Sequence, residues 1–151
     1  MKALVFYIGP DRYALPLAAI GRVLPVAQLK AIALAPPCVA GLLDLHGEPV
    51  PVIDLSRLAG VTAEQVWFDT RIVLADYPLP DGTVASIGLL AEHVTGVEDI
   101  AAEALRDPGV ARAPFMGQVA SGAQGMLQLV DVKQLLTDEL RALLFAQRTA
   151  A

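Results

Sequence analysis

The sequence contains few of the residues from which nucleic-acid interfaces are built. Of 151 residues, 18% are charged and 5% are aromatic, and the net charge is −5. No cluster of lysine or arginine occurs anywhere along the chain. Recognition of nucleic acid needs a basic surface, usually with aromatic side chains on which bases stack. The composition therefore excludes a nucleic-acid-binding protein.

Residue patterns typical of catalysis and of redox chemistry are also missing. The single cysteine, Cys38, excludes a disulfide within the chain and fits a reducing cytosol. It follows two prolines in an apolar context, so we expect it to behave as a small hydrophobic residue. The chain has no glycine-rich phosphate loop, no nucleophile elbow and no histidine pair at ligand spacing. We expect no enzymatic activity, no metal site and no cofactor.

Long uncharged segments are few, and none has the character of a membrane span. The apolar run at residues 3–8 is too short for a secretory signal and has no cleavage site. Residues 113–130 carry no charge but contain Pro114 and three glycines, which exclude a spanning helix. We therefore expect a soluble, cytoplasmic protein with no direct insertion into a membrane.

The residues that are abundant favour a β-rich fold. Hydrophobic residues make up 55% of the chain, and alanine, valine, leucine and isoleucine dominate them. Eleven prolines and twelve glycines are spread along the sequence, as in proteins with many short strands and turns. Branched apolar side chains are suited to filling small β-barrels. The composition predicts a single, mostly β domain.

Two parts of the sequence share one order of apolar residues. The spacing of Leu15, Leu17, Ile20 and Val23 returns 74 residues later in Leu89, Ala91, Val94 and Val97. A strand that ends at Asp54 returns 77 residues later in a strand that ends at Asp131. The opening strand, residues 4–6, has a counterpart at residues 72–74. These repeats predict two similar β-subdomains.

Residues 41–58, GLLDLHGEPVPVIDLSRL, combine a turn, a strand and a helix start. Gly41 and Gly47 lie where the chain must turn tightly, and we expect both to need a backbone that a side chain disfavours. Because of two prolines in the following strand, we expect it to run along a sheet edge or to enter the sheet only near Val52. Asp54 then caps the next turn through its carboxylate, and Asp131 is expected to do the same in the second repeat.

The C-terminal part of the sequence predicts a helix over residues 131–147. Thr137 provides a second N-cap, with two acidic residues in the first turn behind it. An apolar stripe at helical spacing either covers an open barrel end or binds a partner; it consists of Leu136, Leu140, Leu143, Leu144 and Gln147. Trp67 and Phe68 are expected to form a plug between the barrels rather than a ligand platform.

The stretch 41–58 resembles the signature of CheW-like domains, the adaptor modules that join chemoreceptors to a histidine kinase. Further segments that resemble the family are residues 6–17, 35–41, 87–97 and 129–136. The resemblance implies two small SH3-like, five-stranded β-barrels packed side by side, with short capping helices and a C-terminal helix. The first barrel is expected at about residues 13–66, and the second at about residues 1–12 and 67–130.

The resemblance also implies a function and a set of partners. It predicts a non-catalytic adaptor between a methyl-accepting chemoreceptor-like coiled coil and the regulatory domain of a CheA-type histidine kinase. The partner surface is expected at a groove between the barrels, formed by Ile20, Val23, Gly41, Leu42, Val94 and Val97. An alternative interpretation places these apolar side chains in the core, above all Val23 and Val97. A different function is also open, a stand-alone protein that binds a small ligand in the cleft between the barrels.

Two positions of the expected partner surface depart from the family. In the adaptors that this chain resembles, glutamate occupies the position of Arg22 and arginine the position of His46, next to Gly47. Here an acid–base pair has become two basic groups, so the family's salt bridge cannot form. Either both residues are solvated without a role, or the charge change selects a different set of partners. We favour the changed partner set.

Overall fold

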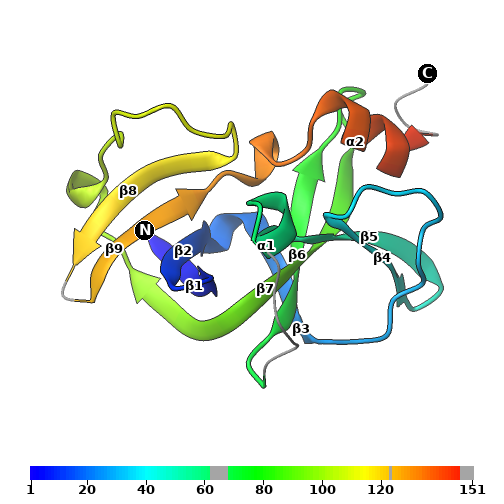
Figure 1. Ribbon diagram of the computed structural model, residues 1–151, viewed down its shortest axis with the longest axis horizontal. Coiled ribbons are helices and arrows are strands. Elements are labelled where there is room, and N and C mark those ends of the chain that lie inside the picture. Colours follow the sequence, from blue (N-terminus) through cyan, green and yellow to red (C-terminus); the bar gives the residue numbers. More distant parts are fainter. Residues whose placement is uncertain (62–67, 123, 147–151) are drawn as a thin grey trace.

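A computed structural model describes residues 1–61, 68–122 and 124–146, and these residues are mostly β-sheet (Figure 1). The strands are β1 (Lys2–Ile8), β2 (Asp11–Pro16), β3 (Ile20–Pro25), β4 (Val39–Leu45), β5 (Glu48–Asp54), β6 (Arg71–Pro78), β7 (Val84–Asp99), β8 (Met116–Gly122) and β9 (Gly125–Val130). The helices are short: η1 (Leu17–Ala19), α1 (Leu55–Leu58), η2 (Ala102–Ala104), η3 (Val132–Gln134) and α2 (Asp138–Leu144). No helix among the described residues is long and apolar enough to span a membrane.

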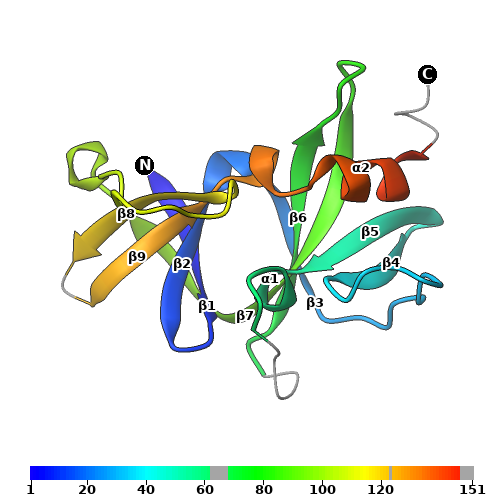
Figure 2. The ribbon, with the colours of Figure 1, turned by 45° about the horizontal axis from the view of Figure 1, so that its top comes forward.

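The strands form two five-stranded barrels that share strand β7. In the first barrel, β3, β4, β5 and β6 join residues 84–91 of β7. In the second barrel, β1, β2, β8 and β9 join the remainder of β7. Figures 1 and 2 show β7 curving from one barrel into the other. The predicted mostly β fold with two barrels side by side is confirmed.

The two barrels exchange their opening hairpins, and this corrects the residue ranges predicted for them. The hairpin β1–β2 lies at the start of the chain but pairs with β9 in the second barrel. The hairpin β6–β7 follows the first repeat but pairs with β3 and β5 in the first barrel. Residues 13–16 therefore belong to the second barrel and residues 71–78 and 84–91 to the first, the reverse of the prediction, whereas β1 lies in the second barrel as predicted. Short apolar strands of similar sequence carry no signal that would reveal this exchange.

The registers establish which residues of the two repeats are equivalent. Ala14 pairs with Leu129 in one parallel ladder, and Gly88 pairs with Val52 in the other, which reproduces the spacings of 74 and 77 residues. Leu4 lies opposite Leu15, and Val73 lies opposite Leu89, so Leu4 is equivalent to Val73. The counterpart predicted for the opening strand was therefore wrong by one residue. A slip of one residue reverses the two faces of a strand, and a uniformly apolar run leaves it undetected.

Each barrel is closed by one isolated bridge between its edge strand and the loop that faces it. In the first barrel Lys30 and Leu42 exchange backbone hydrogen bonds of 2.9 and 2.8 Å. In the second barrel Arg106 and Val119 do the same, at 2.9 and 2.8 Å. The first closure requires a glycine beside it, because a Cβ on Gly41 would lie only 2.7 Å from the carbonyl oxygen of Lys30.

The main hydrophobic core runs through both barrels and unites them. It contains Phe6 and Leu15 from the second barrel together with Ile53 and Leu89 from the first, and all four are fully buried. Leu140 and Phe145 from the C-terminal segment complete this core. Smaller clusters fill the remainder of each barrel, around Val5 in the second and Val50 in the first. The barrels therefore cannot separate without exposing the largest core.

The capping residues start three helical turns. Asp54 accepts hydrogen bonds from the backbone N–H groups of Ser56 and Arg57, and Asp131 accepts one from Lys133. Thr137 accepts one from Leu140 and starts α2. The single helix predicted for residues 131–147 is thus two pieces, η3 and α2, because the chain turns between the two caps.

The predicted apolar stripe and aromatic plug are only partly reproduced. Leu136 and Leu140 are buried and Leu144 is half-buried, whereas Leu143 is 45% exposed, so α2 mainly covers the first barrel. Phe68 is 97% exposed and is no plug. Trp67 and Gln147 lie outside the described residues.

Replacement of Gly41 by alanine should destabilise the fold by roughly 2–4 kcal/mol, because its φ of +144° disfavours a side chain and the new Cβ would clash with the Lys30 backbone. At Gly47, with φ +89° and open space around it, alanine should cost only about 1 kcal/mol. Urea denaturation of both variants measures the difference. Gly21→Ala is the matched control, since its Cβ would lie 3.6 Å from its nearest neighbour at an ordinary φ. A loss at Gly41 no larger than that at Gly21 would contradict this account of barrel closure.

Candidate partner-binding surface

Four of the predicted partner residues occupy equivalent positions in the two barrels. Ile20 on β3 is equivalent to Val94 on β7, and Val23 is equivalent to Val97. Ile20 and Val94 are both half-buried and pack against the main core. Val23 is 44% exposed and Val97 is 51% exposed, so the interpretation of these two valines as core residues is wrong. The fold thus leaves branched apolar side chains at the surface of both barrels.

The other two residues of the predicted groove serve the closure of the first barrel. Gly41 is buried beside the Lys30 backbone, and Leu42 pairs with Lys30 through its own N–H and C=O. The half-buried side chain of Leu42 lines a cavity of about 420 Å³ between the hairpin β4–β5 and the end of α2. The role of Gly41 is therefore conformational, and Leu42 borders a different hollow from the one predicted.

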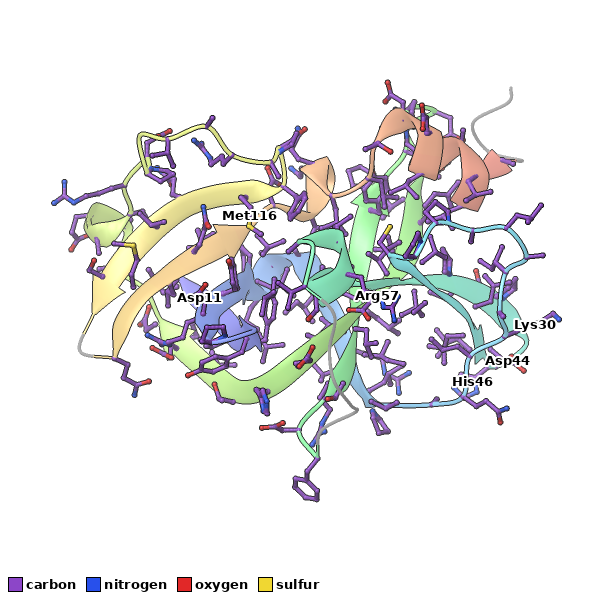
Figure 3. The ribbon with its side chains drawn as sticks, in the orientation of Figure 1. Asp11, Lys30, Asp44, His46, Arg57 and Met116 are labelled. Carbon is purple, nitrogen blue, oxygen red and sulfur yellow. The ribbon has the colours of Figure 1, made fainter. Side chains whose placement is uncertain are left out.

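His46 and Gly47 form a two-residue turn between β4 and β5. Their φ values of +52° and +89° are both positive, as in the type I′ turns that match the twist of a hairpin. Asp44 holds the turn by accepting a hydrogen bond of 2.7 Å from the Gly47 N–H. Figure 3 places His46 and Asp44 near Lys30 at the outer end of the first barrel. The turn presents an exposed imidazole ring.

Arg22 is exposed on β3, where its backbone lies opposite Leu74. Within the described part of the chain, no ion pair or hydrogen bond joins Arg22 to His46. Both basic groups are therefore available to a partner without the loss of a contact between them.

A polar cluster that the sequence did not predict lies where β7 passes from the first barrel to the second. His93 has a positive φ of +49°, and its Nδ1 lies 2.9 Å from Oδ1 of Asp69. The Asp69 carbonyl accepts a hydrogen bond of 3.0 Å from the N–H of Val94. The ring of Tyr7 meets the imidazole edge-on. No local pattern predicts these contacts, because they join residues of β1, of β7 and of the connection before β6.

Next to this cluster, α1 is tied to β7. The hydroxyl of Ser56, 1% exposed, donates a hydrogen bond of 2.8 Å to Glu92. Together, Ser56 and Asp69 bind the crossing point of β7 from both ends of the connection between α1 and β6. The angle between the barrels is therefore held by polar contacts as well as by the core. No group of three or more His, Cys, Asp or Glu residues suited to a metal ion occurs among the described residues.

Comparison with known proteins agrees with the two-barrel architecture. The family model of the CheW-like domain matches residues 2–140. The chain belongs to the CheW-like domain family. It is 26% identical over 144 residues to "Chemotaxis protein CheW" of Klebsiella aerogenes, a match that covers 93% of this chain and 84% of that protein. Its fold is similar to that of the scaffolding protein TtCheW from Thermoanaerobacter tengcongensis, with a TM-score of 0.79, 23% identity, and coverage of 89% and 90% of the two chains.

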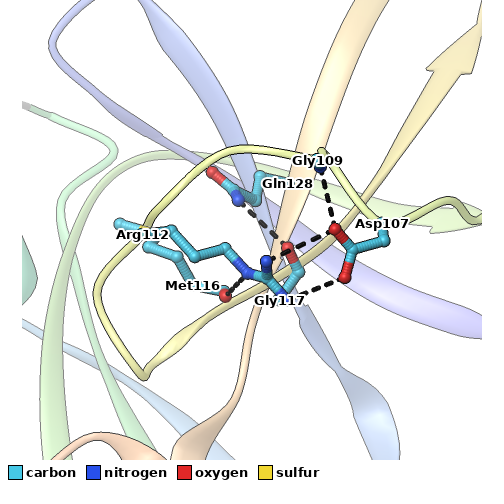
Figure 4. Close-up of polar contacts among 6 residues, drawn as sticks. All are labelled: Asp107, Gly109, Arg112, Met116, Gly117 and Gln128. Carbon is cyan, nitrogen blue, oxygen red and sulfur yellow. Dashed lines mark hydrogen bonds and ion pairs between the residues drawn. The ribbon is translucent and has the colours of Figure 1, made fainter.

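This CheW-like chain also has a loop before β8 that a single arginine organises (Figure 4). The Nε of Arg112 donates to the carbonyl of Met116 at 2.8 Å, and its NH2 lies 3.2 Å from the carboxylate of Asp107. The Gly109 N–H and the Arg112 charge lower the pKa of the Asp107 carboxyl. Val110, 66% exposed, lies within this loop. The arginine thus gives the loop a defined shape at the surface of the second barrel.

Stability should depend on pH through Asp54. Burial raises the pKa of its carboxyl above the ordinary value of 3.8, although hydrogen bonds from the N–H groups of Arg57 and Ser56 oppose the rise. The Asp54 carboxyl therefore binds its proton more tightly in the folded state than in the unfolded state. The free energy of unfolding then falls as pH rises past the ordinary pKa of 3.8 and through the raised pKa of the folded state. Asp54→Asn keeps the capping oxygen and removes the charge. The variant should gain stability relative to the wild type as pH rises from about 3 to about 7.

Urea denaturation of both proteins across this pH range measures the gain. Asp131→Asn makes the same change at the exposed equivalent cap and reports the effect of the amide itself. A difference between Asp54→Asn and wild type that stays constant with pH would contradict the role assigned to burial.

Proposed function

We propose that this CheW-like protein is a non-catalytic coupling adaptor of a cytoplasmic chemosensory pathway. Its partners are a chemoreceptor-like coiled coil and the regulatory domain of a CheA-type histidine kinase. The match of the CheW-like domain over residues 2–140 carries the proposal. The names of the relatives, a chemotaxis protein and a scaffolding protein, agree with it.

The receptor surface in this proposal lies around the equivalent pairs Ile20 with Val94 and Val23 with Val97. A helix of a coiled coil offers apolar side chains at positions three and four residues apart. The exposed valines supply apolar area, and the half-buried pair anchors it to the core. A rigid site of this kind loses little conformational entropy on binding.

The kinase surface in this proposal includes the exposed basic groups at Arg22 and His46. Charge at the rim of an interface governs partner choice more than stability, because exposed ion pairs contribute only about 0–1 kcal/mol to folding. The loss of the family's acid–base pair favours a partner other than the usual kinase of the flagellar pathway.

Direct titration tests the function. The purified chain should bind the kinase regulatory domain and the receptor signalling segment encoded near its own gene. Each Kd should lie in the micromolar range, which corresponds to a binding free energy of about −8 kcal/mol. Calorimetry or fluorescence anisotropy at fixed salt measures both affinities. Absence of binding to either partner at about 100 μM would overturn the adaptor function.

Val23→Asp and Val97→Asp should each weaken binding to the receptor segment by about tenfold or more, because a carboxylate would be buried against apolar helix residues. The same titration measures the loss, and thermal unfolding verifies that each variant is folded. Val110→Asp is the matched control, since this exposed valine lies outside the surface. Equal affinities for wild type and both variants would show that the receptor binds elsewhere.

The double change Arg22→Glu with His46→Arg restores the charges of the related adaptors. It should strengthen binding to a flagellar-type kinase and weaken binding to the kinase of this protein's own pathway, each by several-fold. Four titrations at one salt concentration, wild type and double variant against both kinases, measure the exchange. Identical affinities in all four would mean that neither position faces the kinase.

A further inference from the structure

A second hollow lies between the barrels, next to Ile20 of the proposed receptor surface. It has a volume of about 650 Å³ and is open to solvent. We call it the η1–η3 groove; its lining includes Ala18, Ala19, Asp76, Val84, Gly117 and Asp131. Figure 2 shows η1 and η3 between the strands β8–β9 on one side and the hairpin β6–β7 on the other. None of the residues predicted to bind partners lines it.

The repeat in the fold provides a counterpart of this groove in the other half of the molecule. By the registers of the ladders, Ala18 and Ala19 are equivalent to Glu92 and His93. Likewise Pro78, on the wall of the groove, is equivalent to Gly9. The counterpart therefore lies where β7 crosses between the barrels.

Val61, which follows α1, packs against the counterpart. The N–H of Val61 donates a hydrogen bond of 2.8 Å to the carbonyl of Ser56, and the Val61 side chain packs over Gly9, whose Cβ would lie 4.0 Å from Val61 Cγ1. At the other end of the connection, Asp69 contacts His93. Val61 and Asp69 thus both contact this side. On the η1–η3 side the chain leaves η3 for α2, and the equivalent groove stays open.

The chemistry of the groove differs from that of its counterpart in a way that selects an occupant. Alanines replace Glu92 and His93, so the floor offers apolar contacts in place of the ion pair with Asp69. Exposed carboxylates come from two walls, Asp76 on β6 and Asp131 after β9, against one ammonium group on Lys133. An apolar chain segment that carries a positive charge complements these walls.

We propose that the η1–η3 groove binds an extended peptide segment of a partner protein. The segment places a branched apolar side chain over Pro78, beside Ala18 and Ala19, and a basic residue near Asp76 and Asp131. This apolar side chain occupies the position that Val61 occupies over Gly9 in the other half. The groove adjoins Ile20 of the proposed receptor surface but shares no lining residue with it, so the adaptor function can hold without this site.

Blocked tetrapeptides of sequence AVAK, AVAE and ASAK are suitable probes, with acetylated N-termini and amidated C-termini. In ¹⁵N–¹H spectra of the full chain, AVAK should shift the amide signals of Ala18, Ala19 and Gly117 saturably, with a Kd of about 1 mM. Both AVAE, which reverses the charge, and ASAK, which removes the apolar side chain, should bind at least about threefold more weakly.

Two variants test the site itself. Ala18→Trp fills the groove and should abolish the saturable shifts, whereas Ala102→Trp, at an exposed alanine of another 3-10 helix outside the groove, should leave them unchanged. Asp76→Lys, a change at an exposed residue, should reverse the preference for AVAK over AVAE, and thermal unfolding verifies that the variant is folded. Absence of saturable shifts with AVAK up to about 10 mM, or shifts confined to other surfaces, would overturn the proposal.

Discussion

The exchange of hairpins between the two barrels is the constraint on which the rest of the structure depends. Neither repeat can close its own barrel, because β2 finds its parallel partner in β9 and β5 finds its partner in β7. Each repeat therefore satisfies its backbone hydrogen bonds only with strands from the other. Burial follows the same pattern, since Leu15 and Ile53 come from one repeat but lie in different barrels, and both belong to the core that the barrels share.

This arrangement explains why the important surfaces occur in pairs. An exposed position on β3 has an equivalent on the second part of β7, so Val23 and Val97 are both exposed. The grooves at η1 and at the crossing of β7 are equivalent too. They differ because Val61 and Asp69 contact one of them, whereas the chain after η3 takes another course. One duplicated fold thus provides one covered and one open site.

Polar contacts hold the junction that the exchange creates. Ser56 with Glu92, and Asp69 with His93, bind the crossing of β7 from the two ends of a single connection. Because hydrogen bonds depend on direction, they define the path of the strand more narrowly than apolar packing alone. An adaptor that joins two partners benefits from a fixed angle between its barrels, since the position of one partner then determines the position of the other.

The sequence by itself determined the local features. The caps at Asp54 and Thr137, the turn at His46 and Gly47, and the family signature depend on residues close to one another along the chain. The spacing of the two repeats is likewise read directly from the order of residues. Only the tertiary structure decided which hairpin enters which barrel, that Val23 and Val97 are exposed, and that His93 meets Asp69. These outcomes depend on pairing between distant strands, and several apolar strands of similar length and composition are equally compatible with either pairing. Burial of a valine is likewise a property of what packs against it, which its neighbours in sequence do not specify.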